Sequence, residues 1–138
     1  MYLKGFFLLL LISFIYAVRG FTQDTILQDL SVRKPDIQYG IASFYSDKFQ
    51  GRKTSSGEIF SQKKLTAAHN TLPLGTYIRV TNLRNKKSVI VRVNDRLHHR
   101  NKRLVDLSRS AASKIGFIRS GITRVRVDVL GKKPPQGL

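Results

Sequence analysis

The chain contains no cysteine, only three histidines and only eight acidic residues in 138 positions. Without cysteine there is no disulfide framework, no Cys-based zinc site, no thiol nucleophile and no lipid-modified N-terminal cysteine. His69, His98 and His99 are too few for a histidine-rich metal centre, so we expect neither a metal nor a cofactor. Seven acids are aspartates and one is Glu58, so any carboxylate chemistry must use one of these eight side chains.

The first 20 residues differ in composition from the rest of the chain. Lys4 comes before an almost wholly apolar run over residues 5–18, which is shorter than the roughly 20 residues that span a bilayer as a helix. We interpret residues 1–20 as a secretory signal peptide; the alternative is an uncleaved anchor of the same orientation. Either way, the folded part is expected to be periplasmic or secreted, without a lipid anchor and, after cleavage, without a membrane span.

Basic residues are abundant, and 25 Lys and Arg give a formal net charge of +17. Residues 1–20 carry Lys4, Arg19 and no acid, so their removal lowers this charge by two, to +15. Such an excess predicts a polyanionic partner. Nucleic acid is the default partner of so basic a domain, but the export signal favours polyanions of the cell envelope, and we expect no nucleic acid.

Four segments are rich in aromatic and β-branched residues and predict strands, namely residues 39–45, 77–82, 87–93 and 123–129. The second and third are separated by four residues and predict a hairpin. The fourth alternates valine with charged residues, so one of its faces should be buried. Residues 21–38 are interpreted as a flexible lead-in and residues 131–138 as a disordered tail.

One short helix is predicted after Ser108, which can cap its first turn. Leu107 and Ala112 stand where a hydrophobic staple would form, and Gly116 supplies a C-terminal stop. The domain over residues 39–130 is therefore mainly β with one short helix, which indicates a small closed or nearly closed barrel.

The sequence also contains a faint internal repeat. Glu58 precedes His69 by eleven positions, and Asp95 precedes Asp106 by the same number. Each half then reaches a glycine and a strand. The match is equally compatible with two-fold pseudo-symmetry and with chance.

Asp95 is the first candidate for chemistry, because it ends a predicted buried strand in the motif Asn94-Asp95-Arg96. A carboxylate held there and partly desolvated would have a raised pKa, as a proton donor to a leaving oxygen needs. The alternative is that Asp95 only pairs with Arg96 or caps a turn.

The other candidates each have an ordinary structural interpretation. His69 follows small residues that allow close approach of a ligand, but a buried structural histidine is more common. Glu58 follows a glycine in a polar loop and alone indicates only a surface residue. Asp106 stands just before the helix, where it would satisfy backbone donors. His98 and His99 are adjacent and are interpreted as solvated loop residues.

Six motifs that follow one another along the chain favour the functional interpretation of these candidates. They are GIASFY at 40–45, FQGRKTSSGE at 49–58, TAAHNTLPLGT at 66–76, VTNL at 80–83, VRVNDR at 91–96 and DLS at 106–108. Together they resemble the rare lipoprotein A family of septal-ring lytic transglycosylases, which share a double-psi β-barrel with expansins. The resemblance covers about residues 39–130.

The resemblance implies a six-stranded double-psi barrel with a peptidoglycan-binding groove and an aspartate as acid and base. The family's functional positions map onto Asp95, Glu58 and His69, which we expect to line one groove. Substrate-binding roles are expected for Tyr45, Thr54, Asn94 and Arg96.

Three departures from the family are visible. The Gly-Pro that usually follows Asn-Asp-Arg is replaced by Leu97-His98, and a Gly-Pro pair fixes backbone geometry, so turnover is left open here. The lipobox cysteine is missing. Since eight residues follow residue 130, we expect no C-terminal domain of the kind that binds denuded glycan in many relatives.

The expected function is therefore an exported peptidoglycan lytic transglycosylase that forms 1,6-anhydro-N-acetylmuramic acid ends. The alternative is a non-catalytic, expansin-like module that binds peptidoglycan glycan strands. We expect a monomer in either case. A basic polyanion-binding or membrane-active protein would leave the ordered motifs unexplained.

Overall fold

The computed structural model describes residues 35–138. The predicted signal peptide, residues 1–20, and most of the predicted lead-in, residues 21–38, lie outside this range. Within the described range, no helix combines the length and the apolar character that a membrane crossing requires.

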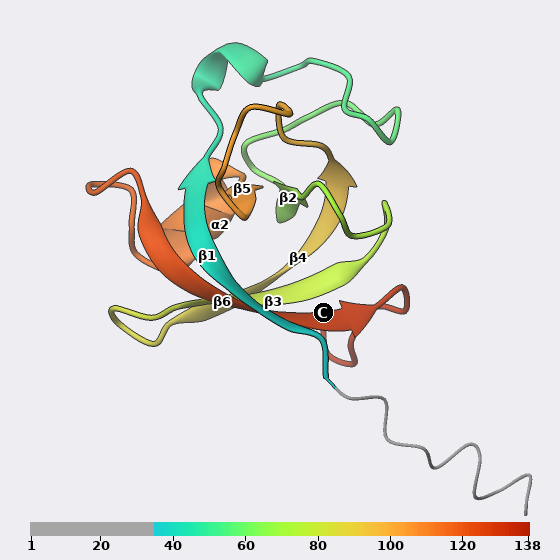
Figure 1. Ribbon diagram of the computed structural model, residues 1–138. Helices are drawn as coiled ribbons and strands as arrows, with labels where there is room; N and C mark the ends of the chain where they lie inside the picture. The colour runs from blue at the N-terminus through green and yellow to red at the C-terminus, as the bar shows by residue number, and fades with distance from the viewer. Residues whose placement is uncertain (1–34) are drawn as a thin grey trace, which may run out of the picture. The chain divides into compact units, whose positions relative to one another are not determined.

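Within residues 35–138, six strands close into one barrel (Figure 1), with one α-helix and one 3-10 turn beside them. The strands are β1 (Ile37–Phe44), β2 (Thr66–Ala68), β3 (Tyr77–Asn82), β4 (Ser88–Asp95), β5 (Val105–Leu107) and β6 (Thr123–Gly131). The helical segments are η1 (Asp47–Phe49) and α2 (Arg109–Lys114). Around the barrel the strand order is β1-β5-β2-β4-β3-β6, and β6 pairs with β1 to close it. This confirms the predicted mainly β, six-stranded barrel.

The strand pairing repeats between the first three strands and the last three. β1 is parallel to β5 and antiparallel to β6; correspondingly, β4 is parallel to β2 and antiparallel to β3. Exchanging the two halves therefore leaves every pairing unchanged, as two-fold pseudo-symmetry requires. The sequence match of Glu58 with Asp95 is not part of this symmetry. Asp95 ends β4, whose counterpart β1 ends at Phe44, whereas Glu58 lies in the loop beyond.

The barrel interior is filled by small and β-branched side chains. Val89, Val91 and Val93 of β4 alternate with less buried residues, and Val125 and Val127 of β6 do the same. The alternation predicted for residues 123–129 is therefore confirmed. Such a row buries one face of each strand and leaves the other face for loops and solvent.

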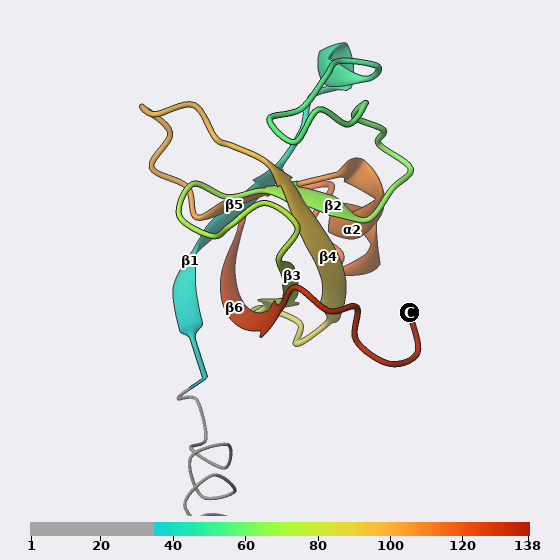
Figure 2. The same cartoon turned by 90° about the vertical axis from the view of Figure 1, so that its right-hand side faces the viewer.

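The helix α2 covers one side of the barrel, beside β4 (Figure 2). The Ser108 hydroxyl accepts a hydrogen bond from the backbone N–H of Ala111 at 3.3 Å, as predicted for its cap. Gly116 follows the helix with a φ of 74°, a left-handed conformation that suits glycine at a helix end.

The structure differs from the sequence-based elements in two places. β1 begins at Ile37, because Ile37 and Gln38 pair with Asp128 and Val127 of β6; the lead-in is therefore shorter than predicted. The strands β2 and β5 were not predicted at all. Each has only three residues, and their extended form depends on neighbours that lie far away in the sequence.

Two long connections rise from the same end of the barrel, where β1 and β4 end. They are residues 45–65, which include η1, and residues 96–104, and both lie at the top of Figures 1 and 2. This end carries the polar side chains described next.

Candidate active site

Asp95 is the last residue of β4, where the pairing with β2 is irregular. Ala67 pairs with Val93 but Ala68 pairs with Asp95, so Asn94 is an extra residue in β4. A bulge of this kind re-aims the side chains that follow it. Ala67 and Val93 belong to the main core, whereas Ala68 belongs to a second buried cluster. Asp95 is directed towards that second cluster.

Four hydrogen bonds hold the Asp95 carboxylate. One oxygen accepts from the Tyr45 hydroxyl at 2.7 Å. The other accepts from the backbone N–H and the hydroxyl of Ser55, at 2.9 and 2.8 Å, and from the backbone N–H of Arg96 at 2.9 Å. Three separate segments of the chain therefore fix this one side chain.

These hydrogen bonds decide the charge of Asp95. Burial alone raises its pKa, but the bonds from Tyr45, Ser55 and Arg96 outweigh burial and hold the pKa of Asp95 below its usual value. The raised pKa expected from the sequence is therefore wrong for the free protein. An ionised carboxylate at neutral pH is suited to accept a proton or to stabilise a cationic centre.

Tyr45 is fixed by a buried aromatic cluster. Its ring lies 4.3 Å from that of Phe60 and 5.7 Å from that of Phe49, measured between centroids. Burial and the hydrogen bond to Asp95 raise the pKa of Tyr45, so the phenol stays protonated and remains a donor. The donor to Asp95 is therefore held in place by packing as well as by its hydrogen bond.

Two neighbouring hollows share Asp95, Tyr45 and Phe49 in their walls. The smaller one, of about 190 Å³, extends along the loop residues Arg52 to Thr54 and to Phe60. The larger one, of about 470 Å³, extends towards β5 and the connection 96–104. An extended ligand lying across both hollows would pass over the Asp95 carboxylate.

Glu58 lies outside the walls of both hollows. Its two oxygens accept from the two guanidinium nitrogens of Arg92 at 2.6 and 2.7 Å, and Asn94 donates to one of them at 3.3 Å. The bonds from Arg92 are the main cause that lowers the pKa of Glu58 to about 2. Glu58 thus ties the loop 49–62 to β4, one residue away from Asp95.

His69 is buried and also lies outside both hollows. Its Nδ1 accepts from the backbone N–H groups of Thr71 and Leu72, both at 3.2 Å, so Nε2 carries the proton and donates to Gln38 at 2.9 Å. Burial and the nearby Arg96 lower the pKa of His69 and keep the ring neutral. His69 reaches the site through its backbone, whose N–H donates to the Asp95 carbonyl at 3.1 Å.

The four predicted substrate-binding residues lie at different depths. Tyr45 and Thr54 line the smaller hollow, and Tyr45 and Arg96 line the larger one. Asn94 is buried behind Asp95 and donates to Glu58. Arg96 also donates to the His69 carbonyl at 2.6 Å, which holds its side chain against the barrel.

The pair that replaces the family's Gly-Pro makes contacts of its own. Leu97 is buried in the cluster with Tyr45, Phe60 and Ala68. Its backbone N–H donates to the Asn70 side chain at 2.7 Å. This side of the acid is therefore held by an apolar side chain at the position where the family usually has the glycine.

Two further polar residues at the site were not assigned from the sequence. Ser55 supplies two of the four bonds to Asp95, and only its motif position could have indicated it. Asp106 lines the larger hollow and accepts a hydrogen bond from the Ser43 hydroxyl. Burial raises the pKa of Asp106, the opposite direction from Asp95.

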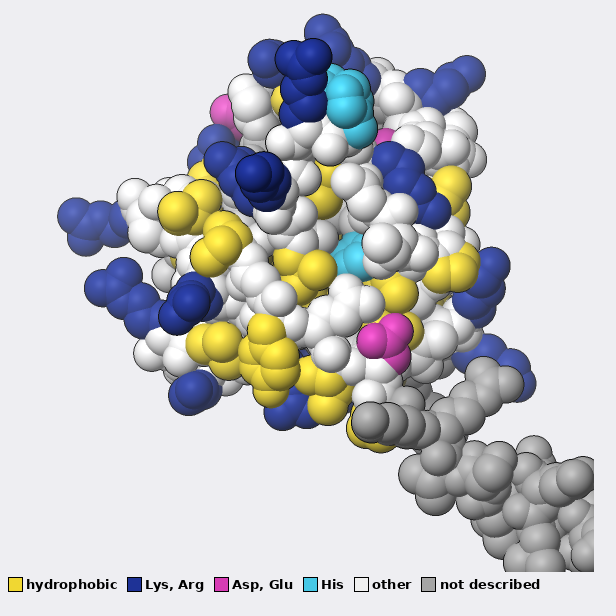
Figure 3. Space-filling view, viewed as in Figure 1, with side chains coloured by type: hydrophobic (Ala, Val, Ile, Leu, Met, Phe, Trp, Pro, Cys, Tyr) yellow, Lys and Arg dark blue, Asp and Glu magenta, His cyan; other side chains and the backbone are white. Residues whose placement is uncertain are grey.

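Basic side chains surround this end of the barrel. Lys48, Arg96 and Arg103 line the larger hollow, and Arg52 and Lys53 line the smaller one. Figure 3 shows Lys and Arg side chains over the same end and the edges of this face, with few acids between them. Among residues 35–138, no group of three or more His, Cys, Asp or Glu side chains is placed to hold a metal ion.

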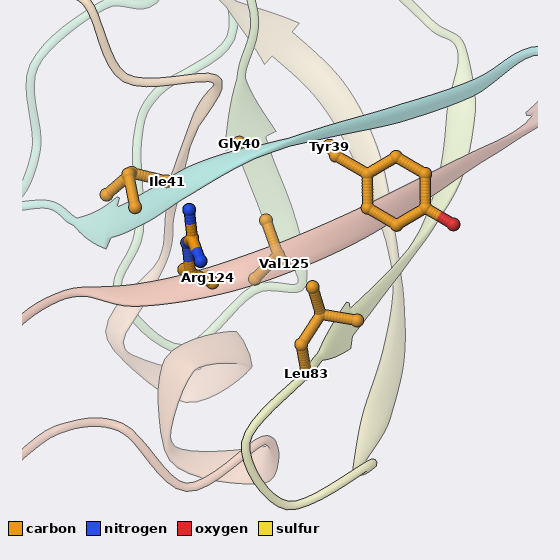
Figure 4. A pocket seen from close by; sticks show the side chains of 6 residues that line it. All are labelled: Tyr39, Gly40, Ile41, Leu83, Arg124 and Val125. Carbon is orange, nitrogen blue, oxygen red and sulfur yellow. The ribbon is translucent and has the colours of Figure 1, made fainter.

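A separate hollow of about 360 Å³ lies on the outer face of β1 and β6 (Figure 4). Its walls are formed by Tyr39, Gly40, Ile41, Leu83, Arg124 and Val125. None of these residues is an acid or a histidine, whereas the two hollows at the loop end contain Asp95 and Asp106 in their walls.

The sequence profile of a family described as lytic transglycolase matches residues 37–127. The chain is 49% identical over 115 residues to the endolytic peptidoglycan transglycosylase RlpA of Haemophilus influenzae, covering 83% of the chain and 39% of that protein. It is 57% identical over 91 residues to the protein of the same name from Pasteurella multocida, covering 66% and 31%. The chain therefore spans only about a third of the length of these relatives.

Two solved structures share the fold at low sequence identity. Streptomyces papain inhibitor superposes with a TM-score of 0.56 at 18% identity, over 68% of this chain and 94% of its own. The expansin of Clavibacter michiganensis gives a TM-score of 0.59 at 22% identity, over 72% and 53%. Both neighbours are double-psi barrels, which confirms that part of the predicted fold. The matched range 37–127 runs from the first residue of β1 into β6, so the chain belongs to the lytic transglycolase family, to which the RlpA proteins also belong.

Proposed function

We propose that this chain is an exported peptidoglycan lytic transglycosylase. It cleaves the bond between N-acetylmuramic acid and N-acetylglucosamine and leaves a 1,6-anhydro-N-acetylmuramic acid end. The observation that carries this proposal is the position of Asp95. Its carboxylate stands between two hollows at the loop end of a barrel of the lytic transglycolase family, and donors from three segments hold it.

Asp95 is the proposed catalytic carboxylate. During bond cleavage its negative charge stabilises the oxocarbenium-like centre at C1 of the muramic acid. It then accepts the proton of that sugar's 6-hydroxyl as O6 closes onto C1. A single-carboxylate cycle would also require Asp95 to donate the first proton. Its lowered pKa supports the base half of that cycle better than the acid half.

Glu58 and His69 are positioning residues in this proposal. Glu58 holds the loop that presents Ser55 to Asp95, through its ion pair with Arg92 and its bond to Asn94. His69 holds the backbone beside Asp95 from the β2 side. The water-activating second carboxylate of inverting hydrolases is not needed, because the attacking group is the sugar's own hydroxyl.

The substrate is proposed to be the glycan strand of peptidoglycan, bound by a monomer in the periplasm or outside the cell. Tyr45, Thr54 and Arg96 line the hollows that would receive the sugars, and Asn94 supports them from behind. The basic residues around the hollows match the peptide-stem carboxylates of the wall. Affinity for sacculi should therefore fall as salt rises, because exposed charges are screened beyond about 8 Å at 0.15 M ionic strength.

Incubation of the purified protein with peptidoglycan sacculi, followed by mass analysis of the soluble fragments, tests this function. Fragments with anhydro ends support the transglycosylase, and fragments with reducing ends would indicate a hydrolase. Binding to sacculi without any release would instead support the non-catalytic, expansin-like binding module.

A further inference from the structure

We propose that Asp106 donates the proton to the leaving sugar oxygen, while Asp95 acts as the base. This assignment rests on the proposed transglycosylase function and divides its proton transfers between two carboxylates.

The strand register places the two carboxylates on one surface. Ala68 of β2 pairs with Asp95 on one side and with Asp106 of β5 on the other. Directly paired residues point to the same face of a sheet, so the two acids flank Ala68. With strand spacings of 4.7–4.9 Å, their backbones are about 10 Å apart. Ala68 itself is buried in the cluster with Tyr45 and Leu97.

The larger hollow contains both acids in its walls. Its volume of about 470 Å³ is comparable with that of small-ligand pockets, which are roughly 300–1,000 Å³. A sugar bound in this hollow would therefore have both carboxylates in the walls around it.

The surroundings of the two acids differ in the way that an acid and a base require. Asp95 accepts four hydrogen bonds. Asp106 lies between the buried residues Val105 and Leu107, and its one described side-chain partner is the Ser43 hydroxyl. Burial raises the pKa of Asp106, whereas the hydrogen bonds of Asp95 lower the pKa of Asp95. Neighbouring groups whose pKa values are pushed apart in this way are typical of acid-base pairs.

The structural role expected for Asp106 is taken by another residue. The sequence suggested that Asp106 satisfies backbone donors at the start of α2. In the structure, Ser108 caps that helix, and the Asp106 carboxylate is directed to Ser43 of β1 instead. The Asp106 carboxylate is therefore not used as a helix cap.

The proposed step consumes no water and no further reactant. Asp106 gives its proton to the oxygen that leaves with N-acetylglucosamine as the C1–O bond breaks. The 6-hydroxyl oxygen of the muramic acid bonds to C1, and its proton passes to Asp95. Solvent then returns one proton from Asp95 to Asp106, so the protein is regenerated with no net gain or loss.

Leaving-group dependence tests the assignment. Two substrates are compared, sacculi and a 2,4-dinitrophenyl glycoside of N-acetylmuramic acid, whose leaving group needs no proton. We expect Asp106→Asn to lose at least about 100-fold in rate on sacculi and to remain within about tenfold of wild type on the aryl glycoside. Asp95→Asn should be slow on both substrates. Asp128→Asn, on the outer face of β6, is the matched carboxylate control and should change neither rate.

Two results would overturn the assignment. One is an Asp106→Asn rate on sacculi equal to that of wild type. The other is an equal loss on both substrates in a variant that melts like wild type, which would show that Asp106 acts in a step other than protonation of the leaving group. If wild type itself releases no anhydro product from sacculi, the failure lies in the proposed function and not in the choice of acid.

Ser43→Ala provides a second test if Asp106→Asn does not fold. It removes the one hydrogen bond to Asp106 and keeps the acid, so the pKa of Asp106 should rise further. The alkaline limb of kcat on sacculi should therefore move to higher pH, and an unchanged limb would contradict the assignment. The other ionisable groups in the walls of the same hollow are Tyr45, Lys48, Asp95, Arg96, His98 and Arg103, and the shift of the limb has to be assigned to Asp106 against these.

Discussion

The two halves of the barrel have the same strand pairings but bring different groups to the loop end. Both carboxylates of the larger hollow, Asp95 and Asp106, come from the half β4–β6. Their hydroxyl donors, Ser43, Tyr45 and Ser55, come from the half β1–β3 and its first connection. Each acid is thus held by a residue from the other half.

This difference shows how a symmetric scaffold becomes an asymmetric site. The parallel pairings of β1 with β5 and of β4 with β2 bring the ends of strands from both halves to one surface. A carboxylate that follows one strand can then be oriented by hydroxyl groups that follow another. The predictions below remove each contribution in turn, from the largest expected effect to the smallest.

Asp95→Asn removes the carboxylate from the half β4–β6. We expect release of anhydro-muropeptides to fall on the order of 100- to 10,000-fold, because loss of a positioned proton-transfer group has that effect. Binding to sacculi and the melting temperature should change little, since asparagine can keep several of the hydrogen bonds. Mass analysis of soluble fragments gives the rate, and sedimentation with sacculi gives the binding.

One outcome of this experiment would contradict the role of Asp95. Equal small amounts of product from wild type and Asp95→Asn would remove Asp95 from the mechanism and favour the binding module. Asp47→Asn, an exposed acid paired with Arg109, serves as the control for the loss of one negative charge.

Leu97→Ala weakens the packing between the halves. Leu97 follows β4 and is buried against Tyr45, Phe60 and Ala68 of the other half. Truncation of a buried leucine costs about 2–5 kcal/mol, and we expect a loss near the lower end of that range because the cluster is small. Urea unfolding measures it. A loss below about 0.5 kcal/mol would mean that this replacement of the family's glycine adds no support to the site.

Tyr45→Phe removes a donor of the half β1–β3 and keeps its ring. Ionised Asp95 loses its 2.7 Å hydrogen bond, so the pKa of Asp95 should rise. A hydrogen bond to a charged group is worth about 1.5–3 kcal/mol, or roughly one to two pH units. The base form would then be lost at higher pH, and the acid limb of kcat/KM should move up by that amount.

The exposed Tyr39 provides the control for this variant, since it lies in the separate hollow of Figure 4. Tyr39→Phe should leave the acid limb in place. A limb that stays in place in Tyr45→Phe as well would show that the limb does not report Asp95.

The elements that could be predicted from the sequence are those with a local residue pattern, and the ones missed form through contacts between distant segments. The long strands and the α2 cap were predictable, because alternating valines and the Ser108 signal are local patterns. β2 and β5 were not, because each has only three residues, too few for an alternating pattern, and each pairs with distant strands on both sides.

The properties of the site were likewise predictable only where they depend on local sequence. Asp95 could be chosen from its position after a buried strand and from its motif. The direction of its pKa could not, because Ser55 lies 40 residues away and Tyr45 lies 50 residues away in the chain. His69 was placed near Asp95 by its motif, but only the structure shows that both ring nitrogens already have partners. Hydrogen bonds between distant segments set these properties.

Glu58→Gln tests an ion pair that reverses the pattern, since here the half β1–β3 supplies the acid and Arg92 of β4 the donor. The more exposed pair of Asp47 with Arg109 has the same arrangement. Arg92 lowers the pKa of Glu58 to about 2, from an ordinary value of 4.5. A carboxylate whose pKa is lower in the folded state stabilises the fold above the ordinary pKa, and the stabilisation is lost as pH falls towards the folded value. The Glu58 side chain is 34% exposed, so we expect the ion pair to add only about 1 kcal/mol to the free energy of unfolding at neutral pH after screening by solvent.

The free energies of urea unfolding of wild type and Glu58→Gln should therefore differ by that amount at pH 7 and converge between pH 4.5 and pH 2. A difference that does not change over this interval would show that Glu58 acts through packing or hydrogen bonding alone, and not through its charge.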